Sequence, residues 1–185
     1  LFLDANNISL SKPLYMISVL GSGSNKTYPF NYMAQIIDDI VKTTKGQVLF
    51  NYIPNQLLQA QDIYNTCKPE TQKHIFFDVF GKSLRSFLAI TSLCNAIIGN
   101  EGGAINMAKA LNIKTFAIFS PWIDKSTWNI FEKLGVNESV HLRDYEPQHY
   151  NSNSEKELKP KALTLYTHFK PKFFEQFHYT AELYY

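Results

Sequence analysis

A repeated alternation of short apolar runs with segments of helical periodicity constrains the fold of this chain most. Each apolar run is nearly continuous, which is the pattern of a strand buried on both faces of a parallel sheet. The segments between the runs place apolar residues three and four positions apart, as amphipathic helices do. Strands are expected at residues 14–20, 47–53, 74–80, 96–99, 115–119 and 139–142, and helices at residues 30–44, 54–65, 84–95, 104–111 and 127–134. The alternation predicts right-handed βαβ units around a parallel sheet of about five or six strands.

This order of elements corresponds to an α/β domain with a Rossmann-like, three-layer α/β/α architecture, which we place at residues 1–145. Residues 146–185 begin with a polar loop and continue as a tail rich in Lys, His and aromatic residues. We expect this tail to form helices that pack on the domain or on a partner that is missing. The first residues look like the middle of a protein, so the chain is expected to be part of a longer one.

Composition and charge exclude several classes of protein. A hydrophobic fraction of 45% in 185 residues is enough for a packed core. The net charge of +2, without a dense Lys/Arg stripe, argues against nucleic-acid binding. No apolar run reaches the roughly 18–20 residues of a membrane span. Cys67 and Cys94 lack metal-ligand spacing and are expected to be buried thiols, so a cytoplasmic location is predicted.

The turn at residues 100–103 (NEGG) lies between a predicted strand and a predicted helix. In open α/β sheets ligands bind beyond the carboxyl ends of the strands, where helix N–H groups and the helix dipole point into the crevice. Gly102 and Gly103 let a ligand approach the backbone, and Glu101 can accept hydrogen bonds from hydroxyl groups. The turn therefore suits a ribose or a phosphate. The alternative is a plain turn that uses glycine only for its geometry.

The loop after the first strand, residues 21–29 (GSGSNKTYP), has a complementary chemistry. Its N–H groups can form an anion nest, Ser22 and Ser24 add hydroxyl donors, and Lys26 supplies a point charge for a phosphate. The loop is neither a Walker A motif nor a GxGxxG motif, and short Gly/Ser loops often have no ligand. Because parallel strands end at one edge of the sheet, the two loops are predicted to meet in a single nucleotide site.

The histidines and tryptophans give weaker signals. His141 and His149 flank the acidic residues Asp144 and Glu146, but no helical or hairpin spacing joins them, so no metal site is predicted. No cofactor is predicted either.

Trp122 and Trp128 follow the fifth predicted strand, where they could stack on a base or a sugar. Packing beneath the loop is the preferred interpretation for both. Ser126 or Asp124 is expected to cap the next helix, although residues 124–127 could also line the same crevice.

Several of these stretches resemble the C-terminal domain of the heptosyltransferase-type glycosyltransferases, glycosyltransferase family 9. Residues 26–29 (KTYP) stand where that family has Lys-x-Trp-Pro after the first strand of this domain. Residues 100–106 (NEGGAIN) correspond to its Asp-Ser/Thr-Gly-x-x-His motif. Residues 108–111 (AKAL) and 119–121 (FSP) correspond to its Ala-Ala-Leu and Phe-Gly-x-Thr motifs. The resemblance covers about residues 13–122.

The resemblance implies the donor-binding half of a GT-B enzyme. This half holds a nucleotide-sugar, while an N-terminal domain missing from this chain brings the glycan or glycolipid acceptor and the catalytic base. The transfer would invert the anomeric centre and require no metal. By analogy the acceptor is a lipopolysaccharide-type precursor at the inner face of a bacterial membrane, which would allow peripheral attachment. No catalytic residue is expected in this chain. The candidate donor-binding residues are Ser22, Ser24, Lys26, Glu101, Gly102, Gly103 and Asn106.

The chain departs from the family motif at three positions. Glu101 replaces Asp, Gly102 replaces Ser or Thr, and Asn106 replaces His, while Gln56 lies near a position where the family often keeps Glu. These changes support an alternative, a non-catalytic nucleotide- or sugar-binding module. A nicotinamide-dependent enzyme is disfavoured, because GxGxxG is absent and no acidic residue ends the second strand at residues 50–53.

Overall fold

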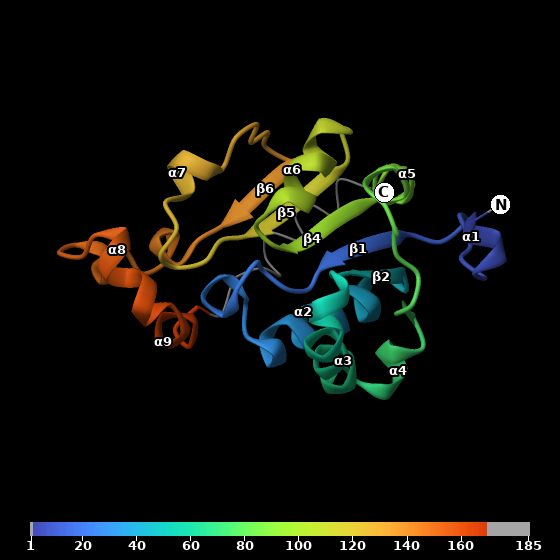
Figure 1. Cartoon of the computed structure of the whole chain (residues 1–185), viewed down its shortest axis with the longest axis horizontal. Helices are drawn as coiled ribbons and strands as arrows, with labels where there is room; N and C mark the ends of the chain where they lie inside the picture. The colour runs from blue at the N-terminus through green and yellow to red at the C-terminus, as the bar shows by residue number, and fades with distance from the viewer. Residues whose placement is uncertain (1, 170–185) are drawn as a thin grey trace.

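The computed structural model describes residues 2–169 and has a six-stranded, fully parallel sheet at its centre (Figure 1). The strand order is β3-β2-β1-β4-β5-β6, so the chain fills one half of the sheet from β1 outward and then returns to fill the other. The predicted three-layer α/β/α fold with a parallel sheet is confirmed. The strands are β1 (Leu14–Ser18), β2 (Gln47–Asn51), β3 (Ile75–Phe76), β4 (Ala96–Asn100), β5 (Lys114–Ile118) and β6 (Asn137–Val140).

Helices cover both faces of this sheet, with α2 and α3 on one side and α5 and α6 on the other (Figure 1). The α-helices are α1 (Phe2–Ala5), α2 (Phe30–Thr44), α3 (Leu57–Thr66), α4 (Pro69–Gln72), α5 (Leu84–Thr91), α6 (Gly103–Ala110), α7 (Lys125–Trp128), α8 (Glu155–Leu158) and α9 (Ala162–Tyr166). Short 3-10 turns are η1 (Ser24–Lys26), η2 (Pro54–Gln56), η3 (Leu142–Asp144), η4 (Pro147–Tyr150) and η5 (Lys159–Lys161). Among the described residues no helix combines the length and the apolar character needed to cross a membrane.

The third strand and the last helix are the predicted elements whose ranges differ most from the structure. The strand expected at residues 74–80 is only Ile75–Phe76, because the chain turns there with a hydrogen bond from Val79 N–H to the Phe76 carbonyl. The helix expected at residues 127–134 is α7, which ends at Trp128. Beyond it Phe131 has a left-handed backbone (φ 57°), which a helix cannot accommodate.

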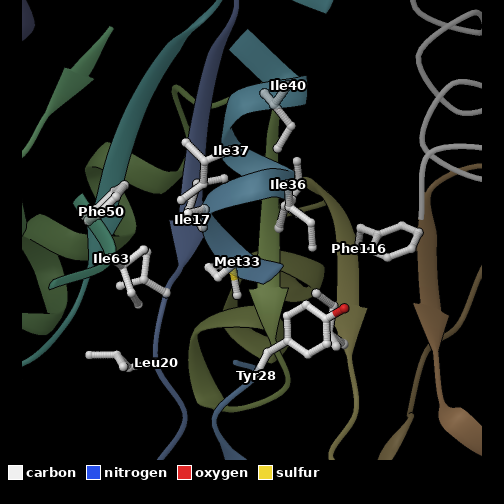
Figure 2. Close-up of a cluster of buried hydrophobic side chains, with 14 of the residues drawn as sticks. Ile17, Leu20, Tyr28, Met33, Ile36, Ile37, Ile40, Phe50, Ile63 and Phe116 are labelled. Carbon is white, nitrogen blue, oxygen red and sulfur yellow. The ribbon is translucent and has the colours of Figure 1, made fainter. Parts of the chain in front are cut away.

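The larger of the two cores lies between the sheet and α2 (Figure 2). Met33, Ile36, Ile37 and Ile40 point from one side of α2 onto the sheet, at the helical spacing that the sequence predicts. They are all fully or almost fully buried. The second core, on the other face, joins α5 and α6 to the same strands. Cys67 and Cys94 are buried free thiols, as expected, and burial raises the pKa of each to about 12.

The described part of the tail, residues 146–169, packs against the first of these cores. Tyr166 and Phe169 are buried against Tyr28, with ring centroids 5.6 and 5.8 Å from the Tyr28 ring. The Tyr28 hydroxyl donates a hydrogen bond to the Phe169 carbonyl (2.9 Å). This aromatic cluster joins the loop after β1 to the end of α9. Residues 170–185, the rest of the predicted tail, lie outside the described part of the chain.

Candidate functional site

A pocket of about 440 Å³ opens at the carboxyl edge of the sheet, beyond β1, β2 and β4. Its place is the point where the strand order reverses between β1 and β4, which is the usual ligand site of a doubly wound sheet. Six of the seven predicted binding residues line it: Ser22, Lys26, Glu101, Gly102, Gly103 and Asn106. Ser24, the seventh, begins η1 and is not part of the lining.

Asn100, at the end of β4, fixes the loop that carries Lys26. Its fully buried side chain accepts a hydrogen bond from the Tyr28 N–H (2.7 Å) and donates one to the Ser18 carbonyl (2.9 Å). Gly99 beside it has φ 130°, and a Cβ there would come within 2.4 Å of the Ser18 carbonyl oxygen. A glycine is therefore required where β4 meets β1. This arrangement places the turn after β4 next to the loop after β1.

Three more side chains hold the same loop from other directions. Gln56 Nε2 donates to the Gly21 carbonyl (2.9 Å), and Trp122 Nε1 donates to the Asn25 carbonyl (3.0 Å). Ser120 also donates to the Asn25 carbonyl. The Lys26 ammonium lies 5.5 Å from the centre of the Trp122 ring, within the range of a cation–π contact. The loop is thus tied to β4, β5 and η2 before any ligand binds.

The start of α6 lines the pocket with its backbone. Helix α6 begins after Gly102, and within the described residues no side chain makes a cap hydrogen bond there. A Cβ built on Gly103 meets no protein atom within 4 Å. The backbone at Gly103 therefore borders open pocket space, where the first N–H groups of the helix are available to a ligand.

Glu101 lines the same pocket as Lys26, two residues before α6 begins. Burial raises the pKa of the Glu101 carboxyl, and the positive charges of Lys26 and Lys109 partly offset that rise. Lys109 is itself largely buried, and its ammonium donates to Asn129 Oδ1 (3.0 Å) and to the Ile130 carbonyl (2.8 Å). Burial lowers the pKa of Lys109. The pocket thus combines one half-buried carboxyl group with one lysine that lines it and a second lysine close by.

The structure adds residues that the sequence had not assigned to the site. Asn51 and Tyr52 reach it from the end of β2, and Gln56, noted only for its place near a family position, lines it from η2. The two tryptophans differ. Trp122 packs under the loop as expected, whereas Trp128 is 58% exposed and borders the pocket. Spacing in the sequence could not predict which tryptophan packs under the loop, because both follow β5 closely.

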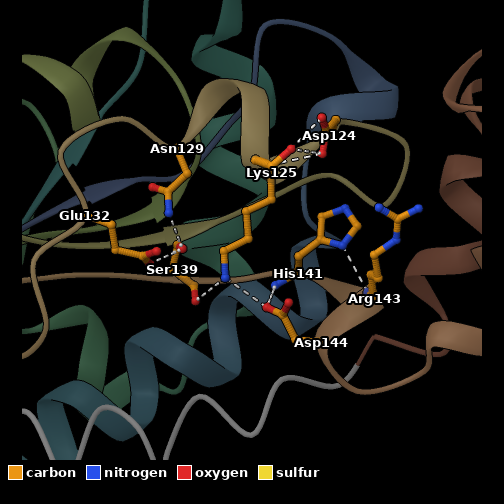
Figure 3. A network of polar contacts seen from close by, with 9 residues as sticks. Asp124, Lys125, Asn129, Glu132, Ser139, His141, Arg143 and Asp144 are labelled. Atoms are coloured by element: carbon orange, nitrogen blue, oxygen red, sulfur yellow. Dashed lines mark hydrogen bonds and ion pairs between the residues drawn. The ribbon is translucent and has the colours of Figure 1, made fainter.

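A second pocket, of about 310 Å³, lies between α7 and η3, and most of its charged side chains have ion-pair or hydrogen-bond partners (Figure 3). Lys125 Nζ contacts Asp144 Oδ2 (3.0 Å), and the Ser139 hydroxyl donates to Glu132 (2.6 Å). Asp124 accepts hydrogen bonds from Ser126 and is therefore, of the two predicted candidates, the residue that caps α7. This network stabilises the turns around β6 and leaves few charges for a ligand.

Comparisons with solved structures identify the fold. The E. coli ADP-heptose LPS heptosyltransferase II is similar with a TM-score of 0.64 and 16% identity, over 92% of this chain and 51% of that chain. A glycosyl transferase family 9 protein from Veillonella parvula gives a TM-score of 0.64 and 16% identity, over 90% and 49%. The fold is that of half a heptosyltransferase.

Two structures of E. coli heptosyltransferase WaaC, with ADP and with ADP-2-deoxy-2-fluoro heptose, give TM-scores of 0.56 and 0.55 at 9% and 10% identity. This chain covers 46% and 44% of their length. The chain thus spans about half the length of the structures it matches. No protein-family model and no curated protein matches the sequence. The predicted resemblance is confirmed at the level of the fold.

Proposed function

We propose that this chain is the donor-binding half of an inverting glycosyltransferase that uses a nucleotide-sugar. The observation that carries the proposal is the pocket at the β1/β4 switch point, where a basic loop and an acidic, glycine-rich turn line one cavity. Its volume, about 440 Å³, suits a small-molecule ligand. The ADP and ADP-sugar bound by proteins of the same fold support a nucleotide diphosphate as its occupant.

Each element of the pocket has a place in this proposal. The N–H groups at the start of α6 and the Lys26 ammonium would bind the diphosphate, because both present positive charge at the same opening. Glu101 would accept hydrogen bonds from ribose hydroxyls, and Asn106 would donate to a phosphate oxygen. Tyr52 and Trp128 offer aromatic surface for the base.

The proposed reaction is an attack by an acceptor hydroxyl on the anomeric carbon, with the nucleotide diphosphate leaving from the opposite face. Negative charge grows on the leaving diphosphate in the transition state. Lys26 and the dipole of α6 would stabilise that charge. The base that takes the hydroxyl proton, and the glycan or glycolipid that carries the hydroxyl, would come from the other half of the enzyme.

A second candidate is a nucleotide- or sugar-binding module without transferase activity. The residues at the family positions favour it, since Gly102 has no side chain to bond with and Asn106 cannot carry the charge of a histidine. In this case the pocket binds the nucleotide, but no transfer follows when the other half is supplied.

Calorimetric titration with ADP, GDP and UDP, and with their sugar conjugates, tests the proposal. Lys26→Ala should weaken diphosphate binding by at least about tenfold, because a hydrogen bond to a charged group contributes roughly 1.5–3 kcal/mol. Lys42→Ala is the matched control, since Lys42 is an exposed lysine of α2 outside the pocket. Equal affinities in the two variants would contradict the assignment of Lys26.

Supplying the other half in a complete chain then separates the two candidates. Transfer of sugar to an acceptor supports the glycosyltransferase, whereas tight donor binding without transfer supports the module.

A further inference from the structure

Three side chains that commonly bind transition metals meet on the surface formed by the tail. Glu146 and His149 lie at η4, and His168 follows α9. Their ligand atoms all lie within 4.8 Å of one another. His149 Nε2 is 2.7 Å from Glu146 Oε2, and the His149 and His168 rings are 5.1 Å apart between centroids. Two segments that are distant in the sequence thus present one carboxylate and two imidazoles to the same point.

The backbones that carry these side chains are held by buried neighbours. Tyr150, next to His149, donates a hydrogen bond from its hydroxyl to the Pro121 carbonyl (2.7 Å) and is largely buried. Phe169, next to His168, is buried against Tyr28. Each histidine is therefore adjacent to an aromatic residue anchored in the core. A group of ligands held in this way is partly organised before an ion arrives, which lowers the entropy cost of binding.

The chemistry of the three groups selects a class of ion. Imidazole suits Zn²⁺ and neighbouring transition metals, whereas Mg²⁺ and Ca²⁺ prefer oxygen ligands. Two histidines and one glutamate leave a fourth tetrahedral position for water. We propose that Glu146, His149 and His168 bind one Zn²⁺ ion, which fastens the end of α9 to η4.

The present distances fit this proposal with small side-chain adjustments. Ligand atoms about 2.0–2.2 Å from one zinc ion lie roughly 3.3–3.5 Å apart in a tetrahedron. The Glu146–His149 contact is a little shorter than that, and no separation in the group exceeds 4.8 Å. His149 and Glu146 keep 29% and 32% of their side chains exposed, so an ion can reach them from solvent.

The site was invisible in the sequence because His168 comes from another segment. The sequence pattern singles out only His141 and His149 and predicts no metal site, and His141 is buried at the start of η3, where its Nδ1 accepts a hydrogen bond from the Arg143 N–H (2.9 Å). In the folded chain His168, and not His141, belongs to the group of ligands around His149. The inference is independent of the donor pocket, to which none of the three residues belongs.

Metal titration of the full chain, after treatment with a chelator and dialysis, tests the proposal. Zn²⁺ binding is measured by calorimetry, and Co²⁺ is used as a spectroscopic substitute whose visible absorption reports tetrahedral coordination. We expect one equivalent of either ion, a higher melting temperature with Zn²⁺, and more than about tenfold weaker binding in His149→Ala and His168→Ala. Glu146→Gln keeps the size of the side chain and removes the anionic ligand, so it should also weaken binding.

His74→Ala is the matched control, because His74 is a half-buried histidine at the start of β3, outside the group. Its affinity for Zn²⁺ should equal that of the unchanged chain. Circular dichroism of each metal-free variant shows that it is folded. Zn²⁺ binding that is absent, or equally strong in His149→Ala, His168→Ala and His74→Ala, would overturn the proposal and leave Glu146 and His149 as a simple ion pair.

Discussion

Replacing Asn100 with Ala tests the reasoning about how the pocket is built. The Asn100 side chain is fully buried and satisfies two backbone groups, the Tyr28 N–H and the Ser18 carbonyl. Alanine leaves both without their partner. Each buried polar group left unsatisfied costs about 1–3 kcal/mol, so the loss of two partners should lower the free energy of unfolding by roughly 2–6 kcal/mol.

Replacing Asn100 with Asp sharpens the test, because it changes one of the two hydrogen bonds. A carboxylate still accepts from the Tyr28 N–H, but it repels the Ser18 carbonyl oxygen. A protonated carboxyl can donate to that oxygen, so burial beside a carbonyl should raise the pKa of the new group in the folded state. The lost stability should therefore be largest at neutral pH and should decrease as the pH falls toward about 4, where the unfolded chain also binds the proton.

Urea unfolding followed by circular dichroism measures both variants, with the slope of the transition checked for constancy. Asn31→Ala provides the control, since Asn31 is an exposed asparagine near the start of α2. Its effect should remain within about 0.5 kcal/mol. A loss below about 1 kcal/mol for Asn100→Ala, or a loss for Asn100→Asp that does not depend on pH, would refute this account of the loop.

Three further predictions concern the pocket and the network beside it. Gly103→Ala should leave stability unchanged or raise it by up to about 1 kcal/mol, because its Cβ meets no protein atom, yet it should weaken nucleotide binding in calorimetry. Glu101→Gln should keep or increase the free energy of unfolding at neutral pH, because burial raises the pKa of Glu101 and so disfavours its charged form, while ADP binding should weaken. Burial lowers the pKa of His141 to about 4. The unfolded chain therefore binds a proton at His141 below about pH 6.5, before the folded chain does, so the free energy of unfolding should fall by about 3 kcal/mol between about pH 6.5 and pH 4. His141→Asn should flatten that part of the urea-unfolding profile, and a profile identical to that of the unchanged chain would disprove the contribution of His141.

Local pattern was enough to predict the sheet but not the ends of its elements. Strands buried on both faces need continuous apolar runs, and β1, β2, β4 and β5 have them. At the edge, the run at residues 74–80 continues into aromatic residues that pack without pairing, with Phe77 against Phe50 and Tyr52. Hydrophobicity alone cannot distinguish such packing from a longer strand.

In the candidate site too, residues placed by the local sequence pattern could be predicted, whereas contacts between distant segments could not. Lys26, Glu101 and Gly103 could be predicted because each follows a strand, and parallel strands end at one edge. The role of Asn100 depends on contacts with Ser18 and Tyr28, which lie far from it in the sequence. Hydrogen bonds between such distant residues depend on the complete fold, so the local sequence pattern does not predict them.

The aromatic cluster of Tyr28, Tyr166 and Phe169 has a consequence for how the chain reaches its native state during synthesis. Two of the rings that cover Tyr28 are synthesised more than a hundred residues after it. Until residue 169 has left the ribosome, the apolar surface around the loop after β1 stays open to water or to other chains. We expect the sheet to form before Tyr166 and Phe169 pack on Tyr28. Nascent chains halted near residue 145 should therefore expose an apolar, aggregation-prone surface beside a folded sheet.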